Sequence, residues 1–322
     1  SPRYVNENCT CCGDCAEACE TEIDSDYDFG MKKVKGAYLP FEMAFPSRYV
    51  ISPQIIGTED AQKCADACKY DAVDLAMESK TIDLQVGSVV WSTGWEPYDA
   101  TKIDNLGFGQ YDNIITNMMM ERLASPNGPT KGKIVRPSDE KAPESIAFVQ
   151  CAGSRDENHL PYCSYICCMA SLKQATYIRE RYPEAKIYIF YIDLRAPGYR
   201  YEQFYEKIKA DENVFFVKGK VAEVSEDPNS NNITVVAENA VTGEKVHQTV
   251  DMAVLATGMQ PTAANAKLPA DLKYNADGFV INDFGKGGMF AAGCANKPAD
   301  VVSSNQNATG MALKAIQTLV RR

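Results

Sequence analysis

The segment Cys151–Lys173, CAGSRDENHLPYCSYICCMASLK, decides the fold prediction for this chain. It follows the apolar run Ile146–Gln150, which predicts a buried strand. Beyond Pro161, the letters YCSYICCMASLKQATYIRER predict a helix over Tyr162–Arg181. A strand, a loop and a helix in this order are typical of a dinucleotide-binding fold, but a cysteine stands where that fold has its glycines.

Four cysteines of this segment are expected to lie together. Cys163 and Cys167 are i,i+4 neighbours on the predicted helix, Cys168 flanks them, and Cys151 ends the strand beside the helix. Four thiolates at one point suit an iron–sulfur cluster or a zinc ion. The alternative, that these are small apolar core residues, explains one or two cysteines better than it explains four.

Length and composition exclude several classes of protein. The chain has 322 residues, enough for two domains, with 45% hydrophobic and 24% charged residues, so it is globular. No apolar run approaches the roughly 20 residues that a membrane helix needs, so we expect no direct membrane insertion. Twelve cysteines without a secretory signal favour metal or redox chemistry over disulfides. The net charge of −10 disfavours nucleic acid as a partner. Because the chain opens without Met, we expect it to be a piece of a longer protein.

A bacterial ferredoxin pattern lies near the start of the chain. The stretch 9–19 reads CTCCGDCAEAC, and its cysteines at 9, 12, 15 and 19 have the spacing C-x2-C-x2-C-x3-C. A second, degenerate motif ends in Cys64 and Cys68, while its first two positions are Thr58 and Ala61. In paired ferredoxin motifs the fourth cysteine serves the other cluster.

That rule predicts one intact [4Fe–4S] cluster, held by Cys9, Cys12, Cys15 and Cys68. Cys19 and Cys64 are then remnants of a second site, or its ligands with help from Cys11 or another group. A zinc ribbon is the alternative, but it needs two separated C-x2-C knuckles and fits the triple spacing less well.

Two further stretches share one design, a strand followed by a Thr-Gly turn, two residues and a proline. In the first, the strand Val86–Trp91 leads to Ser92, Thr93 and Gly94. In the second, a strand within Val250–Pro261 leads to Thr257 and Gly258. Small residues at a strand end let the backbone approach a nucleotide closely, so we expect these five residues to contact a cofactor.

The part between these two turns is predicted to be a doubly wound α/β domain followed by an antiparallel meander. Its first turn reads Cys151-Ala152-Gly153-Ser154-Arg155, so we infer that it has lost nicotinamide binding and carries a cluster. Arg155 and Lys173 either offset the cluster's charge or form a solvated pair. The predicted elements are strands 146–150, 186–192 and 214–217, helices 162–181 and 199–210, and meander strands 220–225, 233–237 and 245–250.

The C-terminal part, 278–319, repeats the theme of a strand, a tight turn and a helix. Strands are predicted at 279–281 and 289–291, and a helix of small residues at 308–319. A turn and a helix N-terminus aimed at one point suit a phosphate or the edge of a flavin. The residues expected to contact that cofactor are Ala292, Gly293, Cys294, Asp300, Val301 and Gln306.

These motifs together resemble a known family. The two Thr-Gly turns and FAAGCA are similar to the two-dinucleotide-domain flavoproteins typified by thioredoxin reductase, although Cys294 stands where those proteins have Asp. The ferredoxin-like insertion, CAGSR, YCS and CC resemble the A-subunit of heterodisulfide reductase and the flavin-containing A-subunit of the quinone-interacting membrane-bound oxidoreductase complex. In that family four cysteines matching 151, 163, 167 and 168 bind a [4Fe–4S] cluster.

The resemblance implies an α/β flavoprotein with a ferredoxin-like insertion. The family's N-terminal G-x-G-x-x-G flavin loop is missing here, so either those residues lie outside this sequence or this piece alone binds flavin poorly. The resemblance implies FAD and [4Fe–4S] clusters, two of them, with a third at the degenerate half as an open alternative. The expected domains are 1–80 (insertion), 81–140 (part of the FAD domain and a linker), 141–255 (second nucleotide-type domain) and 256–322 (rest of the FAD domain).

The chain ends without a further ferredoxin domain, which favours the quinone-linked protein over the heterodisulfide reductase protein. The implied function is electron transfer from menaquinol toward adenylylsulfate reductase in sulfate respiration, with electron bifurcation as an alternative. The implied partners are two other subunits, one a second flavo-iron–sulfur protein and the other a quinone-interacting membrane protein, which would hold a cytoplasmic protein at the membrane. A pyridine-nucleotide disulfide reductase and a zinc-stabilised scaffold are the rival interpretations.

Overall fold

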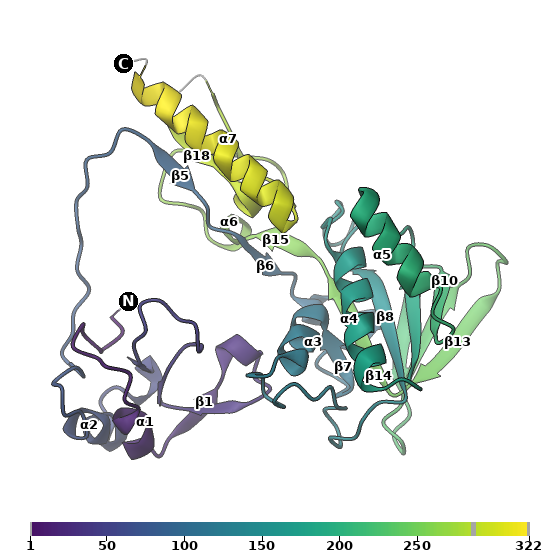
Figure 1. The fold of residues 1–322 in the computed structure, drawn as a ribbon, viewed down its shortest axis with the longest axis horizontal. Coiled ribbons are helices and arrows are strands. Elements are labelled where there is room, and N and C mark those ends of the chain that lie inside the picture. The colour runs from purple at the N-terminus through teal and green to yellow at the C-terminus, as the bar shows by residue number, and fades with distance from the viewer. Residues whose placement is uncertain (1, 285–287, 321–322) are drawn as a thin grey trace. The chain divides into compact units, whose positions relative to one another are not determined.

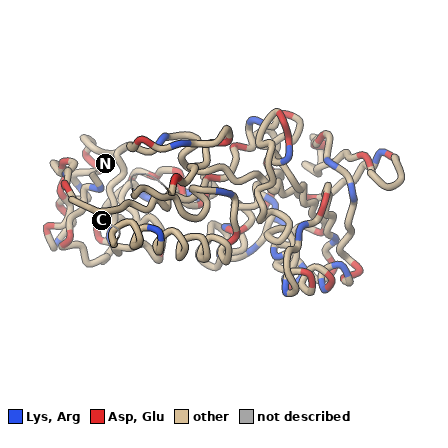
Figure 2. Tube along the Cα trace, turned by 90° about the horizontal axis from the view of Figure 1, so that it is seen from above, with Lys and Arg blue, Asp and Glu red and all other residues tan. Residues whose placement is uncertain are grey.

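A computed structural model describes residues 2–284 and 288–320. The chain divides into two compact units, Ser1–Leu84 with Ser125–Gly132, and Gln85–Ala124 with Lys133–Arg322. Acidic and basic residues are interspersed along the chain (Figure 2). Within the described ranges, no helix combines the length and the apolar character that crossing a bilayer requires.

The first unit consists of short elements around a small core. Its two ends pair with each other: Val5 bridges Val73, and the Asn6 amide donates to the Ala72 carbonyl at 2.8 Å. This pairing carries Cys68, near the end of the unit, back toward the cysteines at its start. The elements are helices α1 (Asp14–Ala18) and α2 (Glu59–Asp66), 3-10 turns η1 (Asp26–Asp28) and η2 (Pro53–Ile55), and antiparallel pairs β1–β2 (Glu22–Asp24, Lys33–Lys35) and β3–β4 (Ala37–Tyr38, Val50–Ile51).

The second unit contains a parallel five-stranded sheet in the order β10-β9-β8-β14-β7. Its central strands are mostly apolar, as strands covered on both faces should be; every residue of Met252–Thr257 is buried. The α/β prediction is therefore confirmed. The strands are β7 (Ile114–Thr116), β8 (Ser145–Ala152), β9 (Lys186–Tyr191), β10 (Val214–Lys218) and β14 (Met252–Thr257).

Helices cover one face of this sheet and a meander covers the other. Helix α4 (Cys167–Arg181) packs on β8 and β14, with α3 (Asn117–Ala124) and α5 (Tyr199–Lys209) on either side of it (Figure 1). The antiparallel meander shares a core with the opposite face, as do the 3-10 turns η3 (Ala100–Lys102) and η4 (Asp104–Leu106). The strands of the meander are β11 (Val221–Glu226), β12 (Ile233–Glu238) and β13 (Lys245–Val250).

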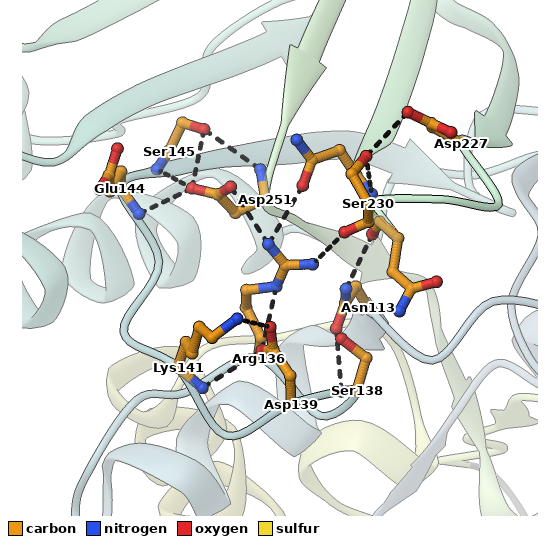
Figure 3. Close-up of polar contacts among 12 residues, drawn as sticks. Asn113, Arg136, Ser138, Asp139, Lys141, Glu144, Ser145, Asp227, Ser230 and Asp251 are labelled. Atoms are coloured by element: carbon orange, nitrogen blue, oxygen red, sulfur yellow. Dashed lines mark hydrogen bonds and ion pairs between the residues drawn. The ribbon is translucent and has the colours of Figure 1, made fainter.

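A buried arginine, Arg136, lies among polar residues near the start of β8 and the segment before β14 (Figure 3). The Arg136 guanidinium donates to the Ser230 carbonyl at 2.7 Å and pairs with Asp251 at 3.4 Å and Asp139 at 3.4 Å. The other Asp251 oxygen accepts from the Ser145 amide at 2.8 Å. The start of β8 and the segment before β14 are thereby held to the meander.

A two-stranded ribbon connects the five-stranded sheet to the remaining elements of the second unit. β6 (Trp95–Pro97) pairs antiparallel with β15 (Met259–Pro261), so the two Thr-Gly stretches found in the sequence are joined to each other. The elements beyond the ribbon form the C-terminal lobe: the parallel pair β5–β18 (Val89–Trp91, Met289–Ala291), α6 (Thr262–Asn265), the pair β16–β17 (Lys273–Tyr274, Val280–Ile281), η5 (Gly293–Ala295) and α7 (Val301–Val320).

Three predicted boundaries were wrong. Helix α4 begins at Cys167 and not at Tyr162, because Tyr165 has φ 72°, which a right-handed helix excludes. Cys163 therefore lies in a loop, and the i,i+4 relation to Cys167 on a helix face does not exist. Helix α7 starts earlier than position 308, at Val301, and β5 begins at Val89 because Val86 is exposed and outside the sheet.

Candidate functional site

Cys151 lies at the carboxyl edge of the parallel sheet, where β8 and β14 adjoin. The pairing of these strands slips by one residue at this point, and Cys151 has φ 57°, in the left-handed region. Such a bulge re-aims a side chain at the end of a strand. The chain crosses from β8 to β9 on one side and reaches β14 on the other, so this is the switch point where open α/β sheets bind ligands.

The loop that carries Cys163 is fixed by buried hydroxyl groups. The Ser154 and Ser164 hydroxyls are 2.7 Å apart, and the Met259 amide donates to Ser164 at 2.8 Å. A Cβ on Gly258 would lie 2.5 Å from the Ser154 hydroxyl, so glycine is needed for the loop to reach β14. The Cys163 sulfur accepts the Tyr165 amide at 3.4 Å. The hydrogen bonds of Ser154 and Ser164 and the close approach at Gly258 therefore fix the position of Cys163, which is not part of a helix.

Cys167 and Cys168 open helix α4 and complete the group. The Cys167 thiol donates to the Thr257 carbonyl at 3.6 Å and the Cys168 thiol to the Asp193 carbonyl at 3.6 Å. These contacts join α4 to the ends of β14 and β9. The structure thus brings together the four cysteines named from the sequence, here called the sheet-edge cysteines: Cys151, Cys163, Cys167 and Cys168.

The sheet-edge cysteines influence one another's protonation. Burial, followed by the neighbouring thiols, raises the pKa of Cys167 far above its ordinary value. Burial and the neighbouring Cys168 raise the pKa of Cys151 to about 11, although Arg155 acts in the opposite direction. Thiols packed this way stay protonated unless a cation stabilises the thiolates, and a bound metal supplies such a cation.

Two arginines supply positive charge at this site, one of them missed from the sequence. Arg155 pairs with Asp193 at 2.9 Å and acts on Cys151. Arg195, in the loop after β9, approaches Cys168. Lys173 pairs with Glu121 at 2.9 Å instead. Arg195 lies in the stretch DLRAPG, which carries no motif, so no sequence signal pointed to it.

The first unit gathers a second group of thiols. One small pocket is lined by the four predicted ligands, here called the insertion cysteines: Cys9, Cys12, Cys15 and Cys68. Tyr49 and Gly13 also line it, and Gly13 has φ 91°, which fits the tight loop expected there. The grouping follows from the end-to-end pairing of the unit, since Cys68 is far from the others along the chain.

The insertion cysteines differ in their electrostatic surroundings. Burial, with Cys9 and Cys12 nearby, raises the pKa of Cys15 to about 11. Burial also acts on Cys68, but the amides of Ala72, Tyr70 and Val73 outweigh it and lower its pKa. The Ala72 amide lies 3.3 Å from the Cys68 sulfur. Amides directed at sulfur stabilise a thiolate, the form that binds a metal.

The three less certain cysteines lie outside that pocket. The Cys11 thiol is 3.2 Å from the Ser47 hydroxyl at the surface. Cys19 and Cys64 are buried in the core of the unit, and burial with the neighbouring Cys19 raises the pKa of Cys64 to about 12. The Thr58 hydroxyl, at the first position of the degenerate motif, caps α2 by accepting from the Ala61 amide.

Each of the two groups offers four cysteine thiols, a donor set that zinc sites and iron–sulfur clusters share. Among the described residues, no three His, Cys, Asp or Glu side chains are positioned to hold one metal ion. A tetrahedral zinc ion needs all its sulfurs about 2.3 Å from one point. A four-iron core is held by four cysteine thiolates, each bound to a different iron. The residues present therefore fit [4Fe–4S] ligation.

The first Thr-Gly turn is open and the second is closed. Ser92 and Thr93 are exposed, and the Thr262 hydroxyl donates to the Thr93 carbonyl at 3.0 Å. Gly94 has φ 76° with free space around it. Thr257 and Gly258 are buried against the sheet-edge cysteines. The first turn is accessible to a cofactor, while the second borders the cysteine group.

The turn after β18 is accessible as well. Gly293 has φ 59° and its amide donates to Asn307 at 2.8 Å; the Cys294 thiol donates to the Ala299 carbonyl at 3.5 Å. Ala292 is buried, whereas Val301 and Gln306 are exposed at the start of α7. The Asp300 carboxylate accepts from the Ser303 amide at 2.7 Å.

A cavity of about 330 Å³ lies beside this turn, and the sequence did not reveal it. Its lining includes the Asn282, Asn296 and Asn307 side chains together with Phe279 and Met311. Amide groups among apolar and aromatic side chains are typical of ligand sites of this size. The buried Trp91 indole N–H, at the end of the adjoining β5, also has no partner in the part of the chain that the structure describes.

Comparison with known proteins gives one consistent result from sequence. No family model matches the chain. It is 38% identical over 330 residues to an iron-sulfur A-subunit of CoB–CoM heterodisulfide reductase from Methanopyrus kandleri, covering 99% of this chain and 50% of the relative. It is 34% identical to the A-subunit of the H2:CoB–CoM heterodisulfide,ferredoxin reductase of Methanothermobacter thermautotrophicus, with 99% and 50% covered.

Among solved structures, thioredoxin reductase of Lactococcus lactis gives a TM-score of 0.47 at 15% identity, with 73% of this chain and 67% of that chain covered. Thioredoxin reductase of T. acidophilum gives 0.45 at 13%, with 97% and 87% covered. The chain spans about half the length of the curated relatives it matches. Over that shared half, it belongs to the family of heterodisulfide reductase A-subunits.

Proposed function

We propose that the chain is an electron-transfer part of a multi-subunit oxidoreductase that contains FAD and [4Fe–4S] clusters. The observation that carries this proposal is the gathering of the sheet-edge cysteines at the switch point of a nucleotide-type sheet. Relatives that are named as iron-sulfur subunits support the same interpretation. The proposal keeps the domain division made from the sequence, with the insertion at 1–80.

One [4Fe–4S] cluster is assigned to the sheet-edge cysteines and a second to the insertion cysteines. Clusters of this kind carry single electrons, and a flavin can exchange one or two. The chain's own contribution is to bury the thiols, to supply the Tyr165 and Ala72 amides to sulfur, and to place Arg155 beside Cys151. Positive charge and N–H donors near a cluster favour its reduced form.

FAD is assigned to the C-terminal lobe. The proposed contacts are the open turn at Ser92, Thr93 and Gly94, and the turn after β18 with the N-terminus of α7. Both turns have a left-handed glycine, whose missing side chain lets a flavin edge or a phosphate approach the backbone closely. Thr257 and Gly258 are proposed to contribute to cofactor binding from the side of the sheet-edge cluster, which they border.

The physiological role is proposed at two levels. The names of the relatives support a role within a heterodisulfide reductase complex, in association with other subunits. The narrower proposal, based on motif resemblance alone, is a cytoplasmic quinone-linked protein that acts between menaquinol and adenylylsulfate reductase and reaches the membrane through a partner. Assaying the isolated complex with menaquinol analogues and with heterodisulfide separates the two.

Iron and acid-labile sulfide analysis tests the cofactor assignment. We expect about eight iron atoms per chain from two clusters, and a broad visible absorbance that dithionite bleaches. Stoichiometric zinc without sulfide would support the scaffold interpretation and reject the proposal.

Cys167→Ser tests the sheet-edge assignment against a matched control. The variant is expected to lose about four iron atoms per chain while it keeps those of the insertion. Cys294→Ser replaces a thiol that bonds to the Ala299 carbonyl, outside both groups, and should retain all the iron. Equal iron in both variants would contradict the assignment.

A further inference from the structure

Cys19 and Cys64 form a buried pair in the core of the first unit. Cys19 follows α1 and is 2% exposed, and Cys64 lies in α2 and is fully buried. Cys19 and Cys64 belong to one cluster of buried residues, and after burial itself the neighbouring Cys19 raises the pKa of Cys64. Neither residue lines the pocket of the insertion cysteines. The pair is therefore distinct from the proposed cluster site beside it.

The space around this pair is filled by protein. A Cβ on Gly36 would lie 2.8 Å from the Ile55 side chain and 3.1 Å from the Cys19 sulfur, so backbone and side chains are already in contact there. Ala61, at the second position of the degenerate motif, is fully buried. A four-iron core needs two ligands besides this pair, and the two motif positions that would supply them hold Thr58 and Ala61 instead of cysteines.

The charge next to Cys19 also opposes an anionic cluster. One Asp60 oxygen lies 3.7 Å from the Cys19 sulfur and accepts from the Thr21 amide at 2.6 Å and the Glu20 amide at 3.1 Å. These bonds lower the pKa of Asp60 to about 2, so the carboxylate is charged at neutral pH. A fixed anion stabilises a protonated thiol and repels both thiolates and cluster.

We propose that Cys19 and Cys64 are a redox-active dithiol that closes to an intramolecular disulfide, separate from the clusters. The co-reactant is a low-molecular-weight disulfide. One cysteine thiolate attacks it, releases one small thiol and leaves a mixed disulfide; the second cysteine then displaces the other small thiol. One S–S bond breaks and one forms, and the electron pair and both protons leave in the two small thiols.

The fold determines how this reaction proceeds and what it changes. Because burial raises the pKa of Cys64 and no sulfur of the pair is accessible, exchange requires local opening of α2 and is slow. The disulfide would join the end of α1, which carries Cys15, to α2, which is followed by Cys68; both of these cysteines are ligands of the proposed insertion cluster. Closing the loop between residues 19 and 64 restricts the opened state, so the oxidised unit should release iron more slowly.

The test uses the full chain with its clusters, equilibrated without oxygen in glutathione buffers of increasing oxidised fraction. After an acid quench and alkylation, fragmentation mass spectrometry identifies the state of each cysteine. We expect a cross-link between Cys19 and Cys64 to accumulate with the oxidised fraction at unchanged iron content. Full alkylation of both cysteines in the most oxidising buffer would overturn the proposal.

Variants separate this inference from the cluster assignment. Cys64→Ala and Cys19→Ala should abolish the cross-link and retain iron; loss of iron in both, with the fold preserved by circular dichroism, would identify the pair as ligands and reject the proposal. Cys68→Ala should lose the insertion's iron and still form the cross-link. A wild-type chain that forms the cross-link but contains no iron would contradict the proposed function alone.

Discussion

Replacing Gly258 by alanine is expected to lower stability and iron content together. Gly258 has no left-handed φ, so alanine is compatible with its backbone and only contacts decide the outcome. The added methyl would lie 2.5 Å from the Ser154 hydroxyl and 2.6 Å from the Leu160 side chain. Both belong to the loop that places Cys163 against β14.

The magnitude follows from what must move. Carbon atoms pack at about 3.5–4.0 Å, so the loop has to retreat by roughly 1 Å. The hydroxyls of Ser154 and Ser164 are buried and hydrogen bonded to each other, which leaves little freedom to rotate. Overpacking costs about 1–3 kcal/mol, and losing the bond from the Met259 amide to Ser164 costs about 1–3 kcal/mol more. The free energy of unfolding should fall by roughly 2–6 kcal/mol.

The assay combines urea unfolding with iron analysis, and Gly219→Ala is the matched control. A Cβ on Gly219 would meet the backbone carbonyl of Glu238 in the meander, so this variant should be destabilised without touching a cysteine. Gly258→Ala should lose the sheet-edge iron, about half of the total, while Gly219→Ala keeps it in the folded state. If Gly258→Ala is as stable as the wild type with full iron, or if both variants lose iron equally, the reasoning is refuted.

Three further predictions concern other parts of the chain. Arg136→Met leaves Asp251 without its buried partner and should lower the free energy of unfolding by about 3–5 kcal/mol, whereas Lys141→Ala, at an exposed ion pair, should change it by less than about 1 kcal/mol in the same urea titration. The Asp60 pKa is lowered from 3.8 to about 2, first by the bond from the Thr21 hydroxyl, so its contribution to stability is present above pH 3.8 and lost as the pH falls toward 2; this part of the acid-unfolding curve should vanish in Asp60→Asn. Cys68→Ser should lose the insertion's iron and Cys11→Ser should retain it; the reverse pattern would assign Cys11 as a ligand.

The sequence revealed the regular elements because their patterns are local. The run Ile146–Gln150 and the meander strands alternate or repeat apolar residues over their own length, and the structure reproduces them. The spacing of the ferredoxin motif likewise predicted a grouping that the structure contains, since Cys68 lines one pocket with Cys9.

What could not be predicted depends on contacts between distant segments. The position of Cys163 is set by Ser164, which bonds to the Met259 amide almost a hundred residues away, and not by helix periodicity. The bulge at Cys151 arises from a slip in pairing with β14, which no pattern in β8 alone encodes. Arg195 and Asp193 reach the site only because β9 ends beside β8.

The ribbon of β6 and β15 explains how the two groups of proposed cofactor residues are connected. Each Thr-Gly turn is hydrogen bonded to the residue just after the opposite strand of the ribbon. The Tyr98 amide, after β6, donates to the Gly258 carbonyl at 2.7 Å, and the Thr262 amide, after β15, donates to the Gly94 carbonyl at 3.4 Å. Three extended residues span about 10 Å, so the open turn and the buried turn are separated by roughly that length. The Tyr162 hydroxyl also donates to the Met259 carbonyl at 2.9 Å, which fastens the loop of Cys163 to the ribbon. A displacement of either strand therefore strains hydrogen bonds at both turns, and the bond from Tyr162 to Met259 is made by the residue directly before Cys163.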